Sequence, residues 1–273
     1  MIKLPSNAES PKGEPDITVA SLTLQEDAYR LAREIFKSEE IASNFANHLL
    51  DVCIKAEGKY FLVVHNPGGW GHARLDQCLE WERGIVAGVK VMMEEMGNSF
   101  LLAQYFRSGE GWWEKMRDLR EQFRFFSSKA NVLAAWLRFI ITHVKGIKVI
   151  LIGISQGAAF GSAVVQRLGE HFPVYSIEFG FPFQYKSWRL ITERTLAVEG
   201  NGVRPDVLVQ GNMWVGARIL MAAPFKWMWY RLRGKPVAFA HCVSAPGHVY
   251  DWSNPEVEGR IRIFLETNFG RQR

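Results

Sequence analysis

Ser155 lies between two glycines in a setting that suits a nucleophile. Residues 153–157 read Gly-Ile-Ser-Gln-Gly, after an apolar run of strand length at 146–152 and before a helix-like segment at 158–168. A strand, a tight turn and a helix in this order expose a serine hydroxyl at the edge of a sheet, because glycines let the backbone turn without Cβ clashes. The pattern therefore predicts a nucleophilic serine. The alternative is a serine that only caps the helix.

A histidine after the serine in the chain is the candidate base. A serine hydroxyl is a weak nucleophile until a base takes its proton, and a third group must orient that base. In sites built on this turn, the chain order is serine, then an acid, then histidine. His248 follows Pro246 and Gly247 in a loop after the apolar run 236–243, whereas His241 lies inside that run. We expect His248 to be the base and His241 to have a core or edge role. The alternative is that His248 is a surface loop residue.

Three carboxylates compete for the role of the orienting acid. Asp206 lies in a loop after the strand-like run 195–198, where an aspartate is also a favoured helix cap. Glu199 stands closer to the end of that run and is the first alternative. Asp251 is near His248 in the sequence, and a residue so close along a loop rarely reaches the far nitrogen of the imidazole ring. We therefore expect Asp206 to be the acid, followed by Glu199 and then Asp251.

A glycine-rich loop upstream is suited to complete the site. When a serine attacks a carbonyl group, the oxyanion that forms needs backbone N–H donors. One donor is expected from Gln156, directly after the serine, and another from the loop after an earlier strand. Residues 65–71 read His-Asn-Pro-Gly-Gly-Trp-Gly and follow the apolar run 60–65. Their glycines allow close approach of the backbone to a substrate, so we expect Gly69 and Trp70 to be these donors.

Strand-like and helix-like segments alternate along most of the chain. This alternation predicts a mostly parallel twisted sheet with helices on both faces. Ligands of such sheets bind at the carboxyl ends of the strands, so the candidate residues gather at one rim. We expect strands at 60–65, 99–105, 146–152, 174–179, 195–198 and 236–243, and helices over about 24–52, 74–96, 114–144, 158–168, 206–232 with a break at Pro224, and 255–268.

The composition is that of a mildly basic globular chain. Of its 273 residues, 48% are hydrophobic and 22% are charged, and the net charge is +5. The Lys and Arg residues form no dense run, so we expect no nucleic-acid partner. No apolar window reaches the about 18 residues that would predict a membrane span. The histidines show no HxH or HExxH spacing, so we expect no metal, and no organic cofactor is implied either.

The cysteines and the first residues bear on the location of the protein. The chain begins with polar, proline-containing sequence rather than the apolar stretch of a signal peptide. We therefore expect a cytoplasmic protein, with export open if the natural chain is longer. Residues 1–22 are expected to form an N-terminal arm, and residues 23–273 one domain. The three cysteines are widely spaced, which predicts free thiols in a reducing compartment: Cys53, Cys78 and Cys242.

The Gly-x-Ser-x-Gly motif, the glycine-rich loop, Asp206 and His248, in this order, resemble the α/β-hydrolase family. The similarity covers roughly residues 58–268 and implies an α/β-hydrolase fold with an eight-stranded type of sheet. It also implies a triad of Ser155, His248 and Asp206. Within the family, the Ser-Gln pair at 155–156 resembles that of certain esterases, cutinases and thioesterases.

A segment rich in Trp, Met and basic residues, 207–235, is expected to form a small helical cap. Residues 180–193 are too few for a large lid after the preceding strand. The cap segment could be an apolar wall for an acyl chain or a patch that makes peripheral contact with a membrane. It could equally be a helix packed on the sheet, with tryptophans as filler. We expect a substrate pocket lined by His65, Trp112, Trp113 and Trp214.

These patterns predict a serine hydrolase that cleaves carboxylic esters through an acyl-enzyme. The expected substrate is a small-molecule or lipid-like ester with an apolar acyl group. A thioesterase or an acyltransferase would use the same triad with a different leaving group or acceptor. A third interpretation is a non-catalytic binding protein of the same fold, against which the intact serine, acid and histidine argue. The oligomeric state stays open.

Overall fold

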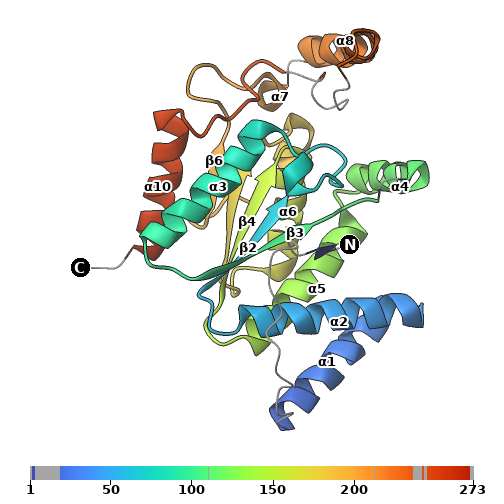
Figure 1. The fold of residues 1–273 in the computed structure, drawn as a ribbon, viewed down its shortest axis with the longest axis vertical. Helices are drawn as coiled ribbons and strands as arrows, with labels where there is room; N and C mark the ends of the chain where they lie inside the picture. The colour runs from blue at the N-terminus through green and yellow to red at the C-terminus, as the bar shows by residue number, and fades with distance from the viewer. Residues whose placement is uncertain are drawn as a thin grey trace.

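A mostly parallel β-sheet forms the centre of the molecule (Figure 1). The computed structural model describes residues 2–3, 19–109, 111–211, 213–235, 242 and 245–270. Within these ranges the sheet has six strands in the order β1-β3-β2-β4-β5-β6. Their bounds are β1 (Ile2–Lys3), β2 (Phe61–Asn66), β3 (Phe100–Tyr105), β4 (Lys148–Ile154), β5 (Val174–Phe179) and β6 (Thr195–Val198).

The five longer strands are parallel to one another. β2 lies between β3 and β4, with Val63 opposite Leu102 on one side and Ile150 on the other. The short β1 is antiparallel to β3 and places Ile2 opposite Tyr105. Because the parallel strands all point the same way, the loops after β2, β4, β5 and β6 meet at the carboxyl edge of the sheet.

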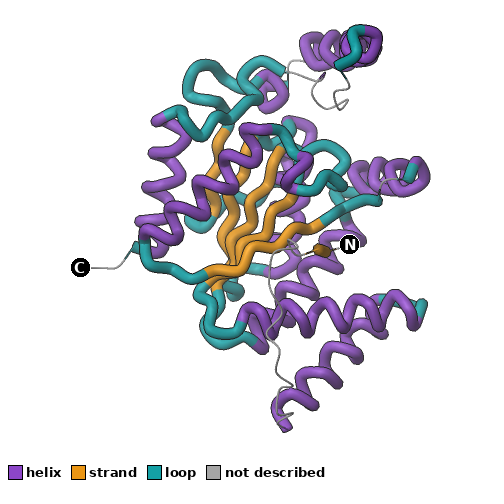
Figure 2. Tube along the Cα trace, in the orientation of Figure 1, coloured by secondary structure: helices purple, strands orange, loops and turns teal. Residues whose placement is uncertain are grey.

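Helices cover both faces of the sheet (Figure 2). α2, α5 and α6 cover one face, with α1 packed on α2, whereas α3 and α10 cover the other. α8 lies beyond α7 at the outer end of the molecule (Figure 1). The bounds are α1 (Val19–Ile35), α2 (Glu39–Ala56), α3 (Glu80–Glu95), α4 (Trp112–Phe123), α5 (Ser127–His143), α6 (Gln156–Leu168), α7 (Val207–Gln210), α8 (Met213–Leu232), α10 (Pro255–Phe269), and the 3-10 helices η1 (Leu75–Gln77) and η2 (Phe183–Trp188).

The alternation of side chains along the strands separates two hydrophobic cores. Along β2, Leu62 and Val64 pack into the core beneath α2, α5 and α6. Phe61 and Val63 point the other way, into the core beneath α3 and α10. Both faces of the strand are therefore buried, which explains its continuous apolar sequence.

The predicted fold class is confirmed. The sheet is mostly parallel, helices cover both faces, and a strand, a sharp turn and a helix enclose Ser155, which together make an α/β-hydrolase fold. Five predicted strands are present within two residues of their expected bounds. The predicted strand over 236–243 lies outside the described residues, apart from Cys242.

Three helix predictions need correction. The single helix expected over 24–52 is two helices, α1 and α2, with Ser38 capping the second. The helix expected over 114–144 is also two helices, because Phe125 and Phe126 both adopt positive φ values and end the helical path. Pro224 does not break its helix: α8 continues through it, and the interruption comes earlier, at Gly211. None of the described helices is long and apolar enough to cross a membrane.

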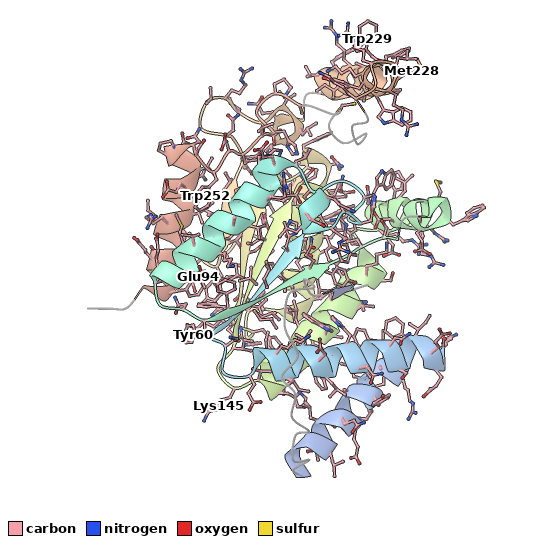
Figure 3. The ribbon with its side chains drawn as sticks, in the orientation of Figure 1. Tyr60, Glu94, Lys145, Met228, Trp229 and Trp252 are labelled. Carbon is pink, nitrogen blue, oxygen red and sulfur yellow. The ribbon has the colours of Figure 1, made fainter. Side chains whose placement is uncertain are left out.

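Trp252 anchors the loop after His248, because its indole packs directly against the backbone of α3 at Gly88 (Figure 3). A Cβ atom at Gly88 would overlap the indole ring, so only glycine leaves room for it at this position. A Cβ at Gly84, one turn earlier on the same helix, would lie 3.7 Å from the Trp252 Cβ, an ordinary contact.

Replacing Gly88 by alanine should lower the free energy of unfolding by about 1–3 kcal/mol, because the added methyl group overpacks against the indole. Gly84→Ala is the matched control. Its methyl group fits, and alanine favours the helix, so its stability should equal or exceed that of the wild type. Urea unfolding curves of the three proteins measure the effect. Equal stability of the two variants would contradict the tight packing of Trp252.

Candidate active site

Ser155 occupies a strained turn between β4 and α6. Its backbone has φ 51° and ψ −116°, a conformation that residues other than glycine rarely adopt. The flanking glycines are required by space: a Cβ at Gly153 would lie 2.6 Å from the Ala158 Cα, and one at Gly157 would overlap the Asn66 carbonyl oxygen. Strain of this kind costs about 1–3 kcal/mol and is typical of functional turns.

His248 and Asp206 form a short hydrogen bond at the same edge of the sheet. The His248 Nδ1 atom lies 2.6 Å from the Asp206 Oδ2 atom, although the residues are 42 positions apart. Asp206 is fully buried, and its other oxygen, Oδ1, accepts a 2.8 Å hydrogen bond from the Leu208 N–H at the start of α7. The two roles considered for Asp206, helix cap and partner of histidine, are therefore fulfilled by different oxygens of the same carboxylate.

Tyr250 is a third partner of this carboxylate. Its hydroxyl donates a 2.6 Å hydrogen bond to Asp206 Oδ2. Burial of the Asp206 carboxyl group by itself would raise its pKa, but the hydrogen bonds and charge of His248, with the donors Tyr250 and Leu208, leave that pKa below its ordinary value. Asp206 is therefore a carboxylate at neutral pH. Such an acceptor keeps the proton of a neutral His248 on Nδ1, which leaves Nε2 free to act as a base.

The other candidate acids are engaged elsewhere. Glu199 lies 2.5 Å from the Arg189 guanidinium, which also donates a 2.7 Å hydrogen bond to the buried Glu178. Burial raises the pKa of Glu178 to about 7, even with Arg189 beside it. Asp251 accepts a hydrogen bond from the Ser253 N–H, 2.9 Å away. The structure thus brings Asp206, and neither Glu199 nor Asp251, to the ring of His248.

The end of β5 joins the serine turn to the histidine pair. The Ser155 N–H donates a 2.7 Å hydrogen bond to the Phe179 carbonyl oxygen. At the next residue, Gly180, a Cβ would lie 2.6 Å from the His248 Cε1 atom and 2.8 Å from Asp206 Oδ2. Both parts of the candidate site therefore rest on two consecutive residues. Within the described chain, no hydrogen bond joins the Ser155 hydroxyl to His248; such bonds are often long until a substrate is bound.

The glycine-rich loop is held in place by Arg107, which sequence reasoning missed. The buried guanidinium donates hydrogen bonds to the carbonyl oxygens of Pro67, at 3.0 Å, and Gly69, at 2.5 Å. The next residue, Ser108, donates a 2.6 Å hydrogen bond to the Trp70 carbonyl oxygen. These contacts fix which way the peptide groups of the loop face.

Three backbone N–H groups, one after Ser155 and two in the glycine-rich loop, are left without a partner in the described part of the chain. They belong to Gln156, Gly69 and Trp70, the predicted donors to an oxyanion. Donors that are fixed in position and not already bonded are what an oxyanion requires. The predicted role of these three groups is consistent with their surroundings and stays a prediction.

His65 lies beneath this loop and not in a pocket, which corrects the prediction made for it. Its side chain is fully buried, and its Nε2 lies 3.0 Å from Glu82, whose carboxylate also accepts a hydrogen bond from the Gly68 N–H. The Gln104 amide nitrogen lies 3.1 Å from its Nδ1, while the amide oxygen accepts from Leu75. His65 therefore supports the loop from below, with both ring nitrogens occupied.

The tryptophans predicted to line a pocket lie on the outside of the molecule. Trp113 on α4 is 82% exposed and Trp214 on α8 is 84% exposed, so neither is a wall of an enclosed pocket. The Trp112 side chain lies outside the described residues. The aromatic rings beside the candidate base are instead those of Tyr250 and Trp81, whose centroids lie 5.9 Å and 6.1 Å from that of His248. No group of three or more metal-binding side chains occurs among the residues that the structure describes.

The chain was compared with protein families, with curated proteins and with solved structures. No protein-family model matches the sequence, and a search of curated proteins finds no match. Among solved structures, the chain is similar to a cutinase from Trichoderma reesei, solved in complex with a C11Y4 phosphonate inhibitor. The similarity covers 70% of this chain and 87% of the cutinase chain, with 12% sequence identity and a TM-score of 0.40.

The lowered pKa of Asp206 should appear as a dependence of stability on pH. A carboxylate whose pKa is lower in the folded state contributes stability above its unfolded pKa, near 3.9, and loses that contribution as the pH falls through the folded value. Asp206→Asn should therefore be clearly less stable than the wild type at pH 7, and the difference should shrink as the pH falls below about 4. Urea unfolding at several pH values measures it. A difference that does not change with pH would contradict the ionised pair.

Proposed function

We propose that the protein is a serine hydrolase that cleaves carboxylic esters through an acyl-enzyme. The observation that carries this proposal is the 2.6 Å contact between His248 and the buried Asp206, beside a serine held in a strained turn at the same strand end. A helix cap alone would need neither the histidine nor the strain. This combination of a half-buried serine, a base and an orienting acid is the arrangement that nucleophilic acyl transfer needs.

In the first half of the proposed reaction, His248 Nε2 takes the proton of the Ser155 hydroxyl while Oγ attacks the carbonyl carbon of the ester. The carbonyl π bond breaks and its electrons form an oxyanion. When the tetrahedral intermediate collapses, the bond to the alcohol oxygen breaks, and His248 gives its proton to the leaving alcohol. Asp206 stays ionised throughout and stabilises the positive charge that His248 carries between these steps.

In the second half, water takes the place of the alcohol. His248 removes a proton from the water molecule, whose oxygen attacks the acyl carbon and forms a second tetrahedral intermediate. Collapse of this intermediate releases the carboxylic acid, and His248 returns the proton to Ser155 Oγ. The free N–H groups of Gln156, Gly69 and Trp70 are the proposed donors to the oxyanion in both halves. The loss of one such donor costs on the order of 100- to 1000-fold in rate.

The surroundings of the site favour an apolar acyl group. Trp81 contacts the His248 ring, and Trp70, in the glycine-rich loop, is 39% exposed. Such rings offer apolar surface to a substrate and no charged partner. A thioesterase or an acyltransferase would use the same serine, histidine and acid, and would differ in the leaving group or in the acceptor that replaces water. A comparison of substrates can separate these chemistries.

A series of p-nitrophenyl esters of increasing acyl length, with acyl-CoA thioesters in parallel, tests the proposal. We expect wild-type turnover of the esters to exceed that of the thioesters. Asp206→Asn should lower kcat by about 1000- to 10,000-fold, because the histidine loses the partner that sets its tautomer.

Glu199→Gln is the matched control, because it removes the charge of a nearby carboxylate that pairs with Arg189 instead of His248. Its kcat should stay within a few-fold of wild type. If Asp206→Asn keeps near-full activity, Asp206 is not the acid. If acyl-CoA is the better substrate, the protein is a thioesterase or an acyltransferase. If the wild type turns over neither class, the proposal of a hydrolase is wrong.

A further inference from the structure

α8 presents a stripe of large apolar side chains to solvent. The members of this stripe are separated by 7, 4, 3 and 4 residues, so at 3.6 residues per turn they share one face of the helix. Their exposed fractions range from 53% to 84%. Ala223, on the opposite face, is fully buried, and α8 packs against α7. The apolar stripe consists of Trp214, Met221, Phe225, Met228 and Leu232.

The position of α8 leaves this stripe accessible. The helix lies at the outer end of the molecule, beyond α7 and away from the sheet (Figure 1). Figure 3 shows Met228 and Trp229 on the side of α8 that faces away from the sheet. Trp229, next to the apolar stripe, is itself 55% exposed. The exposed Arg218 lies on the same face between Trp214 and Met221, so the continuous part of the stripe begins at Met221. An exposed apolar surface of this kind marks a site of interaction with a partner.

The charge of the surrounding segment indicates what kind of partner fits. No Asp or Glu occurs between Asp206 and Asp251. Without the five cations of this segment, the remaining 28 of the 33 Lys and Arg residues equal the 28 Asp and Glu residues, so the segment accounts for the whole net charge of +5. The five cations are Arg218, Lys226, Arg231, Arg233 and Lys235, and the side chains of all five are exposed.

Cations and tryptophans also meet directly on this helix. The Arg231 guanidinium lies 4.4 Å from the ring centroid of Trp227, and that of Arg233 lies 4.3 Å from the ring centroid of Trp229. Apolar side chains, tryptophan rings and basic groups on one helix fit the boundary between the headgroups and the acyl chains of a bilayer. There, the apolar groups enter the acyl region while the cations stay among anionic headgroups.

A second copy of the chain fits this surface less well. A symmetric dimer through α8 would bring two segments of charge +5 together with no carboxylate in either to compensate, and juxtaposed like charges are costly at an interface. A nucleic acid would meet the cations, but it has no use for a stripe of five large apolar side chains along the centre of the surface.

We propose that α8 is a docking surface for membranes that contain anionic lipids, and that it lies along the bilayer surface with its apolar stripe inserted. The helix follows α7, whose first turn is capped by Asp206, so docking would bring the candidate active site close to the lipid. The docking itself does not depend on the proposed hydrolysis.

Sedimentation with vesicles tests this proposal. The probes are vesicles of phosphatidylcholine alone and of phosphatidylcholine mixed with phosphatidylglycerol. The wild type should bind the mixed vesicles at least about 10-fold more tightly, because each basic group near an anionic surface contributes about 1 kcal/mol. Added salt should weaken the binding, since it screens the charges. Equal binding to both kinds of vesicle, or no binding to either, would overturn the proposal.

Phe225→Asp, in the middle of the apolar stripe, should weaken binding to the mixed vesicles by about 10-fold or more, because an apolar contact is lost and a charge of the wrong sign is added. Ile263→Asp is the matched control. Its side chain is also apolar and on a helix, with an exposed fraction of 65% against 70% for Phe225. Its binding should stay within about twofold of the wild type, and equal losses in the two variants would contradict a role for α8.

Two further measurements separate this proposal from its alternatives. Ser155→Ala should bind vesicles as the wild type does, so binding that survives in an inactive protein supports docking even if the proposed hydrolysis is wrong. Light scattering of the free protein should give the same mass for the wild type and Phe225→Asp. If the wild type is a dimer that Phe225→Asp dissociates, the surface serves self-association and the membrane proposal is wrong.

Discussion

The close approach of three backbone segments at the end of β5 is the constraint on which the candidate site depends. Phe179 accepts the hydrogen bond of the Ser155 N–H, and Gly180 leaves just enough space for the His248 ring and the Asp206 carboxylate. A side chain at position 180 would displace both groups. The end of this strand, and not the loops themselves, therefore sets where Ser155 and His248 lie relative to each other.

The loops that complete the site are fastened to buried polar groups. The buried Arg107 guanidinium donates hydrogen bonds to carbonyl oxygens of the glycine-rich loop. The His65–Glu82 pair holds the same loop from below. Breaking such a network leaves buried polar groups unpaired, which is costly. On the other side, Tyr250 and Trp252 hold the segment after His248 against Asp206 and α3. The free N–H groups and the imidazole are thus presented by rigid surroundings, as preorganised catalysis needs.

The sequence was most informative where a pattern reflects local geometry. The two glycines around Ser155 and the apolar runs of the strands follow from backbone space and burial on both sheet faces, so the turn and five strands could be predicted. The approach of Asp206 to His248 was also expected, because the chain order and the parallel sheet imply that their loops meet. The roles of Arg107 and Tyr250 could not be read in the same way, since their contacts span about 40 residues and carry no local signal.

The wrong predictions for the site concern burial, which depends on tertiary packing, and others concern where helices begin and end. His65 follows a strand and was expected to face a substrate, but the helix and loop above it cover it completely. Trp214 was expected to line a substrate pocket, and its side chain is instead exposed to solvent. Pro224 was expected to break its helix, and α8 continues through it.

Mass spectrometry after treatment with an ester-like phosphonate probe tests the central claim most directly, because the probe reports a nucleophilic serine without requiring the natural substrate. The account predicts one adduct per chain, located on the peptide that contains Ser155, and none on Ser155→Ala under the same conditions. An unlabelled wild type, or an adduct that persists in Ser155→Ala, would contradict it.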